Sequence, residues 1–254
     1  MSPLRSITLL SALPLHIPYS IFNIPYPSPH TLDVSVRTQW LCRNLQQTSR
    51  PKHTIIESMG QALYRKYRSK SLDEIVGQSH ITDMLRRAIK TDRVAHAYLL
   101  TGPRGVGKTS IARILAHEIN QLSYTDESTH LDIIEIDAAS NNGVDDIREL
   151  RERAMIAPTS ARKKIYIIDE VHMLSKPAFN ALLKTLEEPP SHVVFILATT
   201  DVEKLPATII SRVQRFNFRA IHPEAAVGHL RMIANNEGIA IDDDALALIA
   251  HHGR

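Results

Sequence analysis

The segment Gly102-Pro-Arg-Gly-Val-Gly-Lys-Thr109 constrains the fold of this chain more than any other part of the sequence. It matches the pattern G-x-x-x-x-G-K-[ST], in which glycines let backbone amides turn toward phosphate oxygens. A short apolar run, Ala97–Thr101, comes before it, and residues 109–119 have a helical pattern. A strand, a glycine-rich loop and a helix in this order predict a phosphate-binding loop, because the helix directs its amino-terminal amides at the same anion.

The chemistry of this loop predicts ATP and Mg²⁺ as cofactors. The Lys108 ammonium should reach the β- and γ-phosphates, and the Thr109 hydroxyl should ligate the magnesium ion. We prefer this interpretation to a structural glycine turn because the loop lies between a strand and a helix, as phosphate binding requires. The residues expected to contact the nucleotide are Gly102, Pro103, Arg104, Gly105, Val106, Gly107, Lys108, Thr109 and Ser110.

A second segment places two acids at the end of an apolar strand. Lys163-Lys-Ile-Tyr-Ile-Ile-Asp-Glu170 ends in Asp169 and Glu170, and the carboxyl ends of strands are where open α/β sheets bind ligands. We expect Asp169 to hold magnesium, usually through water, and Glu170 to orient the attacking water. Two adjacent acids alone are often just solvated, so this assignment depends on the apolar strand before them and on the upstream loop. His172 nearby is interpreted as a hydrogen-bonded structural histidine, with nucleotide sensing as the alternative.

The remaining sequence alternates short apolar runs with helical stretches, which predicts an α/β fold with a parallel sheet and right-handed crossovers. From these patterns we expect a nucleotide-binding domain over residues 59–220 and an incomplete helical lid domain over residues 221–254. The expected strands are Ala97–Thr101, Ile133–Asp137, residues 165–169 and Val193–Thr199. The expected helices are residues 109–119, 144–157, 177–186, 222–237 and 242–250.

The first 58 residues differ from the rest of the chain. They hold seven of the fourteen prolines, and Asp33 and Glu57 are their only acids. The prolines exclude a continuous helix. Three interpretations remain: a disordered leader, an organellar transit peptide, or an early start codon with Met59 as the true beginning. We favour the last, because the ordered pattern begins almost at once after Met59.

Composition sets further limits on function. A net charge of +3 and a pI near 9.0 are compatible with nucleic-acid binding but do not establish it. The single cysteine, Cys42, excludes an intramolecular disulfide and a multi-cysteine zinc site. No run of eighteen apolar residues occurs, so no membrane-spanning helix is expected.

Longer strings in the chain resemble a known family. Six strings carry the resemblance: YRKYRSKSLDEIVGQ, HAYLLTGPRGVGKTSIARILA, EIDAASNNGVDDIRELRE, IYIIDEVHML, FNALLKTLEEPP and FILATTDVEKLPATIISR. They are similar to the gamma/tau subunits of the bacterial DNA polymerase III clamp loader. The resemblance covers about residues 61–254, and LLKTLEEPP and the ISR ending are not general ATPase features. It implies an AAA+ ATPase fold, with a central five-stranded parallel sheet flanked by helices and the start of a small helical lid.

The resemblance also implies roles for single residues. Thr200 corresponds to the sensor of the γ-phosphate, and Arg212 to the arginine finger that enters the ATP site of a neighbouring subunit. Without the family, a surface salt bridge is the simpler interpretation of Arg212. Val76 and Gly77 correspond to the segment beside the adenine. The assignment of Tyr67 and Arg68 to the stretch that closes over the base is weaker.

The implied function is that of an ATP-hydrolysing subunit of the DNA polymerase III holoenzyme, which opens the sliding clamp and loads it on primed DNA. Its expected partners are other clamp-loader subunits, the clamp and DNA phosphates, in the bacterial cytoplasm unless residues 1–58 direct the chain to an organelle. Arg148 and Arg151 are candidate DNA contacts, with a solvated helix face as the alternative. Another AAA+ DNA motor of the branch-migration helicase type and a non-catalytic assembly subunit are the rival functions.

The sequence departs from the family's pattern in ways that bear on the site. Most members insert a four-cysteine zinc module after the loop helix, but residues 120–130 form a short link without cysteine, so no zinc is expected. Val213 follows Arg212 where the family often has cysteine, and the arginine itself is retained. The family's second sensor, an arginine in a Gly-x-x-Arg-Asp pattern, would fall beyond Arg254.

Overall fold

The computed structural model describes residues 62–124 and 130–253. The expectations for residues 1–58 therefore lie outside the described residues. Within the described ranges, five strands form one parallel sheet in the order β2-β3-β4-β1-β5. The strands are β1 (Ala97–Thr101), β2 (Ile133–Asp137), β3 (Lys164–Asp169), β4 (Val193–Thr199) and β5 (Gln214–Asn217). The predicted five-stranded α/β fold is confirmed.

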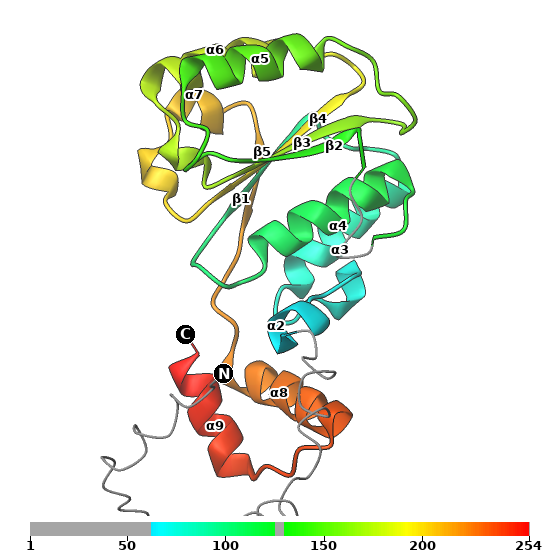
Figure 1. Ribbon diagram of the computed structural model, residues 1–254, viewed down its shortest axis with the longest axis vertical. Helices are drawn as coiled ribbons and strands as arrows, with labels where there is room; N and C mark the ends of the chain where they lie inside the picture. The colour runs from blue at the N-terminus through cyan, green and yellow to red at the C-terminus, as the bar shows by residue number, and fades with distance from the viewer. Residues whose placement is uncertain (1–61, 125–129, 254) are drawn as a thin grey trace, which may run out of the picture. The chain divides into compact units, whose positions relative to one another are not determined.

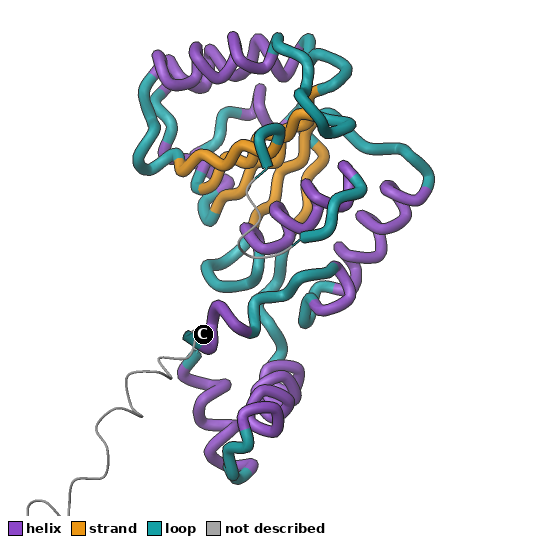
Figure 2. Tube along the Cα trace, turned by 45° about the vertical axis from the view of Figure 1, so that its right-hand side comes forward, coloured by secondary structure: helices purple, strands orange, loops and turns teal. Residues whose placement is uncertain are grey.

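Helices cover both faces of this sheet (Figures 1 and 2). The α-helices are α2 (Leu63–Lys66), α3 (Ser79–Lys90), α4 (Lys108–Asn120), α5 (Val144–Ala154), α6 (Lys176–Glu187), α7 (Ala207–Ile210), α8 (Pro223–Glu237) and α9 (Asp243–His252). Short 3₁₀ turns, Leu72–Glu74, Val171–Met173 and Val202–Lys204, lie between them. In Figure 1, α3 and α4 lie on one face of the sheet, and α5, α6 and α7 lie on the other.

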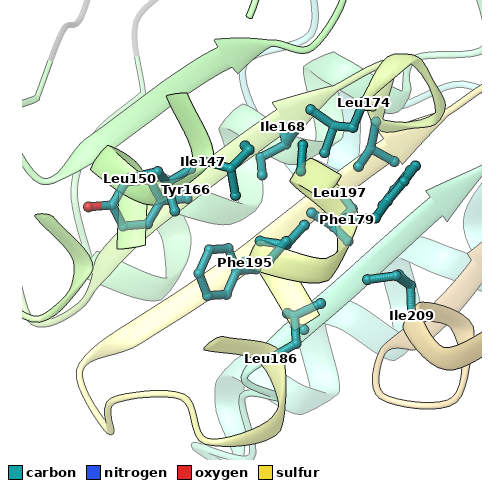
Figure 3. Close-up of a cluster of buried hydrophobic side chains, with 14 of the residues drawn as sticks. Ile147, Leu150, Tyr166, Ile168, Leu174, Phe179, Leu186, Phe195, Leu197 and Ile209 are labelled. Carbon is teal, nitrogen blue, oxygen red and sulfur yellow. The ribbon is translucent and has the colours of Figure 1, made fainter. Parts of the chain in front are cut away.

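The alternation of side chains along each strand explains the two apolar layers. In β1, Leu99 points to the α5–α6 face, whereas Tyr98 and Leu100 point to the α3–α4 face, and all three are buried. Figure 3 shows the α5–α6 layer, in which Tyr166 and Phe195 stack with their ring centroids 5.6 Å apart. Burial on both faces is why these strands read as continuous apolar runs.

The helix boundaries follow from local capping chemistry. The Ser175 hydroxyl accepts a hydrogen bond from the Ala178 amide, with Pro177 in the first turn of α6. Helix α8 begins at Pro223 and is followed by Gly238, whose φ of 67° is left-handed. The expected helix 144–157 is too long, because α5 ends at Ala154. Its last three residues precede Pro158, which disfavours helical backbone just before it.

The strand register brings the carboxyl ends of β1, β3 and β4 to one edge. Thr101 pairs with Thr199, and Ile168 pairs with Leu197, so the residues that follow these strands lie at the same level. The phosphate loop, the two acids and Thr200 are therefore neighbours in space. The described residues contain no helix long and apolar enough to cross a membrane.

Candidate functional site at the carboxyl edge of the sheet

The phosphate loop passes very close to the backbone that follows β5. Gly102 has a φ of 144°, and a Cβ atom there would lie 2.5 Å from the Phe218 carbonyl oxygen. Gly107, with a φ of 92°, is the residue that directly precedes α4. The loop therefore needs glycine at Gly102 for space and at both positions for backbone conformation. Within the loop Val106 is buried, whereas Pro103 and Arg104 are exposed.

Lys108 is nearly buried, and its ammonium lies against the loop itself. The Nζ atom donates to the carbonyl oxygens of Gly102, at 2.9 Å, and Pro103, at 2.6 Å. Burial lowers the pKa of Lys108, and the negative charges of Glu170 and Asp169 oppose that shift. In the part of the chain that the structure describes, no carboxylate contacts this desolvated cation directly, a setting that favours an added anion.

Thr109 and Asp169 meet directly. The Thr109 hydroxyl donates to Asp169 Oδ2 at 2.8 Å, although the two residues are 60 positions apart in the sequence. The other carboxylate oxygen, Oδ1, accepts from the Glu170 amide at 2.9 Å. The two predicted magnesium ligands therefore come together at one point.

Glu170 occupies a strained backbone position and is held by the end of β4. Its φ of 45° and ψ of 46° are left-handed, which is unfavourable for a residue other than glycine. Its Oε2 atom accepts from the Thr200 amide at 3.2 Å and the Thr200 hydroxyl at 3.0 Å. The same oxygen lies 3.3 Å from His172 Nδ1, which is also 2.8 Å from the Thr199 hydroxyl. The prediction that His172 is hydrogen-bonded is confirmed.

The proposed adenine segment contacts the chain that leads into α8. Gln78 is fully buried, and its side-chain amide donates to the Arg219 carbonyl at 2.7 Å and accepts from the Arg219 amide at 3.3 Å. A Cβ on neighbouring Gly77 would lie 3.5 Å from Ile221. Sequence reasoning selected Val76 and Gly77 but missed Gln78. A polar residue beside them was the available signal, and its partner could not be found by pattern.

The stretch before the adenine segment also contacts α8. Glu237 Oε1 accepts from Lys66 Nζ at 2.6 Å and from the Tyr67 hydroxyl at 2.7 Å. These hydrogen bonds raise the pKa of Lys66 and of Tyr67 and lower that of Glu237. Tyr67 is therefore attached to the last turn of α8, and its expected closure over a base stays a prediction.

Arg212 contacts residues of α6 and α7. Its Nη2 atom pairs with Glu187 Oε1 at 2.7 Å, and its Nη1 atom donates to the Thr208 carbonyl at 2.7 Å. Both partners of the ion pair are partly exposed. Within this chain Arg212 therefore makes the surface salt bridge that was its simpler interpretation, and its action on a neighbouring subunit stays a prediction.

Comparison with known proteins connects this geometry to a family. The model of the family described as "DNA polymerase III, delta subunit" matches residues 77–222, the region that carries the loop, both acids, Thr200 and Arg212. The chain belongs to this family of DNA polymerase III subunits.

Curated relatives in the family carry the gamma/tau name. DNA polymerase III subunit tau of Bacillus subtilis is 50% identical over 204 residues, which cover 75% of this chain and 36% of that protein. The Escherichia coli tau subunit is 46% identical over 204 residues, or 75% of this chain and 32% of that protein. The chain thus spans about a third of the length of these relatives. The predicted resemblance to gamma/tau subunits is confirmed.

Solved structures agree on the fold. The Thermotoga maritima RuvB Holliday junction branch migration motor is 25% identical, with a TM-score of 0.58 over 72% of this chain and 59% of its own. RuvB and this family member therefore share the AAA+ architecture of a parallel sheet flanked by helices.

Proposed function

We propose that the chain binds Mg²⁺ and ATP at the carboxyl edge of the sheet and hydrolyses ATP as a clamp-loader subunit. The observation that carries this proposal is the 2.8 Å contact between the Thr109 hydroxyl and Asp169 Oδ2. A phosphate loop and an acid pair form one nucleotide site only if their magnesium ligands converge, and this contact supports that convergence.

The oxygens of Thr109 and Asp169 suit magnesium, which prefers oxygen ligands and completes its shell with water and phosphate oxygens. Residues 62–124 and 130–253 contain no group of three or more His, Cys, Asp or Glu that could hold a metal ion. One hydroxyl and one carboxylate are the small protein share that a magnesium–nucleotide site uses. When bound, the ion would neutralise charge on the β- and γ-phosphates.

Lys108 and the loop backbone would bind the phosphates. The carbonyls of Gly102 and Pro103 now accept from Lys108 Nζ, and phosphate oxygens are stronger acceptors for the same ammonium. The remaining proposed phosphate contacts are Arg104, Gly105, Val106, Gly107 and Ser110, and Val76 and Gly77 would lie near the adenine. The amides at the start of α4 would add their dipole to this binding.

Glu170 would accept a hydrogen bond from the attacking water and so orient it. Thr200 would sense the terminal phosphate. Thr200 and Glu170 already share hydrogen bonds, so a phosphate that attracts Thr200 would also change how Glu170 is held. Arg212 of one subunit would stabilise charge in the site of its neighbour, which requires it to exchange Glu187 for phosphate oxygens.

The wider role follows from the gamma/tau relatives. We infer a hetero-oligomer with other clamp-loader subunits in which ATP binding favours an open sliding clamp on primed DNA, and hydrolysis releases it. DNA contacts would be to phosphates and would therefore weaken as salt rises. Arg148 pairs with Asp145 on the exposed face of α5, so a solvated helix face explains it equally well, and Arg151 stays the other candidate.

The two rival functions make different predictions. A branch-migration helicase would separate strands without a clamp. The likeness to RuvB is one of fold. The 50% identity to a tau subunit favours the clamp-loader role. A non-catalytic assembly subunit would bind partners without turnover, and it would not need Lys108, Thr109, Asp169 and Glu170 together.

Two substitutions separate binding from turnover. Lys108→Ala should weaken ATP binding by about 100-fold or more, since it removes a charge-assisted contact from a buried site. Glu170→Gln should keep ATP affinity within about threefold and reduce turnover by about 100-fold or more. Isothermal titration with a slowly hydrolysed ATP analogue measures binding. Phosphate release, with and without clamp and primed DNA, measures turnover.

Matched controls come from exposed residues far from the loop. Lys90→Ala at the end of α3 and Glu152→Gln on α5 make the same chemical changes away from the site. Both should behave as the unaltered chain. Equal ATP affinity in the Lys108→Ala and Lys90→Ala variants would rule out the nucleotide site, and clamp-independent strand separation would favour the helicase.

A further inference from the structure

One histidine links the acid-bearing end of β3 to the end of β4. The His172 side chain is 9% exposed and belongs to the short turn Val171–Met173 that follows Glu170. Its Nδ1 atom lies 2.8 Å from the Thr199 hydroxyl and 3.3 Å from Glu170 Oε2. A side chain that contacts both the last residue of β4 and the acid after β3 is placed to control where that acid points.

The hydrogen-bond partners of Thr199 determine which atom carries the proton. Its hydroxyl has a single hydrogen, which it donates to the Asp201 carbonyl at 3.1 Å, while it accepts from the Asp201 amide at 3.0 Å. With that hydrogen directed at Asp201, the 2.8 Å contact with His172 uses a hydrogen on Nδ1. The opposite tautomer would place the Nδ1 lone pair 3.3 Å from a carboxylate oxygen, which is electrostatically unfavourable. His172 is therefore a donor at Nδ1.

All the donors around Glu170 act on one of its two oxygens. Oε2 accepts from the Thr200 amide and hydroxyl, and His172 Nδ1 lies 3.3 Å from it while its hydrogen bond goes to Thr199. Among the described residues, none donates a hydrogen bond to Oε1. One oxygen is thus held in place, and the other keeps its lone pairs for a ligand or a water molecule.

We propose that His172 is a positioning residue for Glu170. Its hydrogen bond to Thr199 holds the end of β4 in place, so that the neighbouring Thr200 fixes Oε2 and Oε1 is presented to the hydrogen of the water that attacks the terminal phosphate. The inference rests on the proposed ATPase function. It assigns to His172 a part in catalysis through Glu170, rather than a purely structural one.

Three substitutions test the role of Nδ1. Asparagine carries its amide nitrogen as many bonds from Cβ as Nδ1, whereas the amide of glutamine lies one bond further out. His172→Ala and His172→Gln should each lower kcat up to about tenfold, the upper end of the loss expected for one hydrogen bond. His172→Asn should stay within about threefold of the unaltered chain. ATP affinity should be unchanged in all three, and thermal unfolding identifies any variant that fails to fold.

A double-variant cycle separates positioning from general support. If His172 acts through Glu170, then His172→Ala should have no further effect on turnover in a Glu170→Gln background. Equal turnover in the Ala variant and the unaltered chain would overturn the inference, as would an Asn variant as slow as the Gln variant. A parallel fall in ATP affinity and kcat would also overturn it. If the unaltered assembly hydrolyses no ATP, the proposed function itself fails, which is a different result.

Discussion

The carboxyl edge of the sheet and the apolar layer beneath α5 and α6 differ in how their polar groups are hydrogen-bonded. At the edge, the side chains of Thr109, Asp169, Glu170 and Thr200 bond to one another or to nearby amides, and the backbone at Glu170 is left-handed. In the layer, the Tyr166 hydroxyl is buried without a hydrogen-bond partner among the described residues. In Figure 3 the Tyr166 ring lies beside Leu150 and Ile147, and its oxygen points away from the other labelled side chains.

This difference shows what each region is organised for. Paired polar groups on a strained backbone are costly to build and are retained where a charged ligand must be met. An isolated hydroxyl in a packed layer contributes area and shape, and its polar atom contributes nothing favourable. Substitutions at the functional polar groups should therefore change turnover more than stability, and substitutions in the layer should do the reverse.

The largest expected effect tests Arg212, which is either a catalytic group for a neighbouring site or only part of a surface ion pair. Arg212→Ala should lower turnover of the assembled complex about a thousandfold or more if the guanidinium acts on a neighbouring site. The free energy of unfolding should change by only about 0.5 kcal/mol, because the pair with Glu187 is partly exposed. Steady-state phosphate release and urea unfolding measure the two quantities.

Glu187→Gln is the control for Arg212. It removes the same ion pair but keeps the guanidinium, so turnover of the assembled complex should stay near that of the unaltered chain. Equal losses of turnover in both variants would mean that the salt bridge itself matters. A loss of ATP affinity in the isolated Arg212→Ala chain would show that Arg212 acts within its own subunit.

The next effect lies where the phosphate loop meets the chain after β5. Gly102→Ala would place a Cβ atom 2.5 Å from the Phe218 carbonyl oxygen, so the backbone of the phosphate loop or of the chain after β5 must move. We expect a loss of about 2–4 kcal/mol in the free energy of unfolding, together with weaker ATP binding. Urea unfolding and nucleotide titration of the same variant check both.

Gly228→Ala is the matched change in open space. A Cβ at Gly228 on α8 would meet nothing within 4 Å, so alanine should stabilise this helix by about 0.5–1 kcal/mol. If Gly102→Ala were as harmless as Gly228→Ala, close approach would not be the reason for glycine in the loop.

The sequence predicted these two regions to different extents, for physical reasons. The loop and the acid pair could be read directly, because phosphate and magnesium binding fix residue types at short spacings. Four strands could be read from their apolar runs, but β5 could not: it has four residues, and only Phe216 among them is buried. The expectation of a fifth strand came from the family resemblance.

Contacts between distant segments were beyond pattern reading. The bonds from Gln78 to Arg219, and from His172 to Thr199, depend on which strands become neighbours and in which register. No local period encodes that pairing. The partner of Arg212 was equally hidden, since Glu187 lies in a different element. The roles of Val76, Gly77, Thr200 and Arg212 remain predictions from the family, with positions now known.

The smallest expected effect tests the apolar layer. Tyr166→Phe removes a hydroxyl that has no partner, so the free energy of unfolding at pH 7 should stay equal or rise by up to about 1 kcal/mol. Tyr98 is the control, since it is an equally buried tyrosine. Unlike that of Tyr166, its hydroxyl accepts a 2.8 Å hydrogen bond from the Ala95 amide. Tyr98→Phe leaves that amide unpaired and should cost about 1 kcal/mol.

Alkaline pH sharpens the test. Burial raises the pKa of Tyr166 to about 12 from an ordinary value of 10.0, against a smaller opposing influence of Arg153. The unfolded chain therefore releases this proton first, so the stability that Tyr166 contributes is complete below pH 10 and declines as pH rises toward 12. Between pH 10 and pH 12, the free energy of unfolding of Tyr166→Phe should therefore fall by up to about 2 kcal/mol less than that of the unaltered chain. Urea unfolding at pH 7 and pH 11 measures the difference.

A Tyr166→Phe variant that is destabilised at pH 7 as much as Tyr98→Phe would show that the Tyr166 hydroxyl is hydrogen-bonded after all, and the contrast between the two regions would disappear.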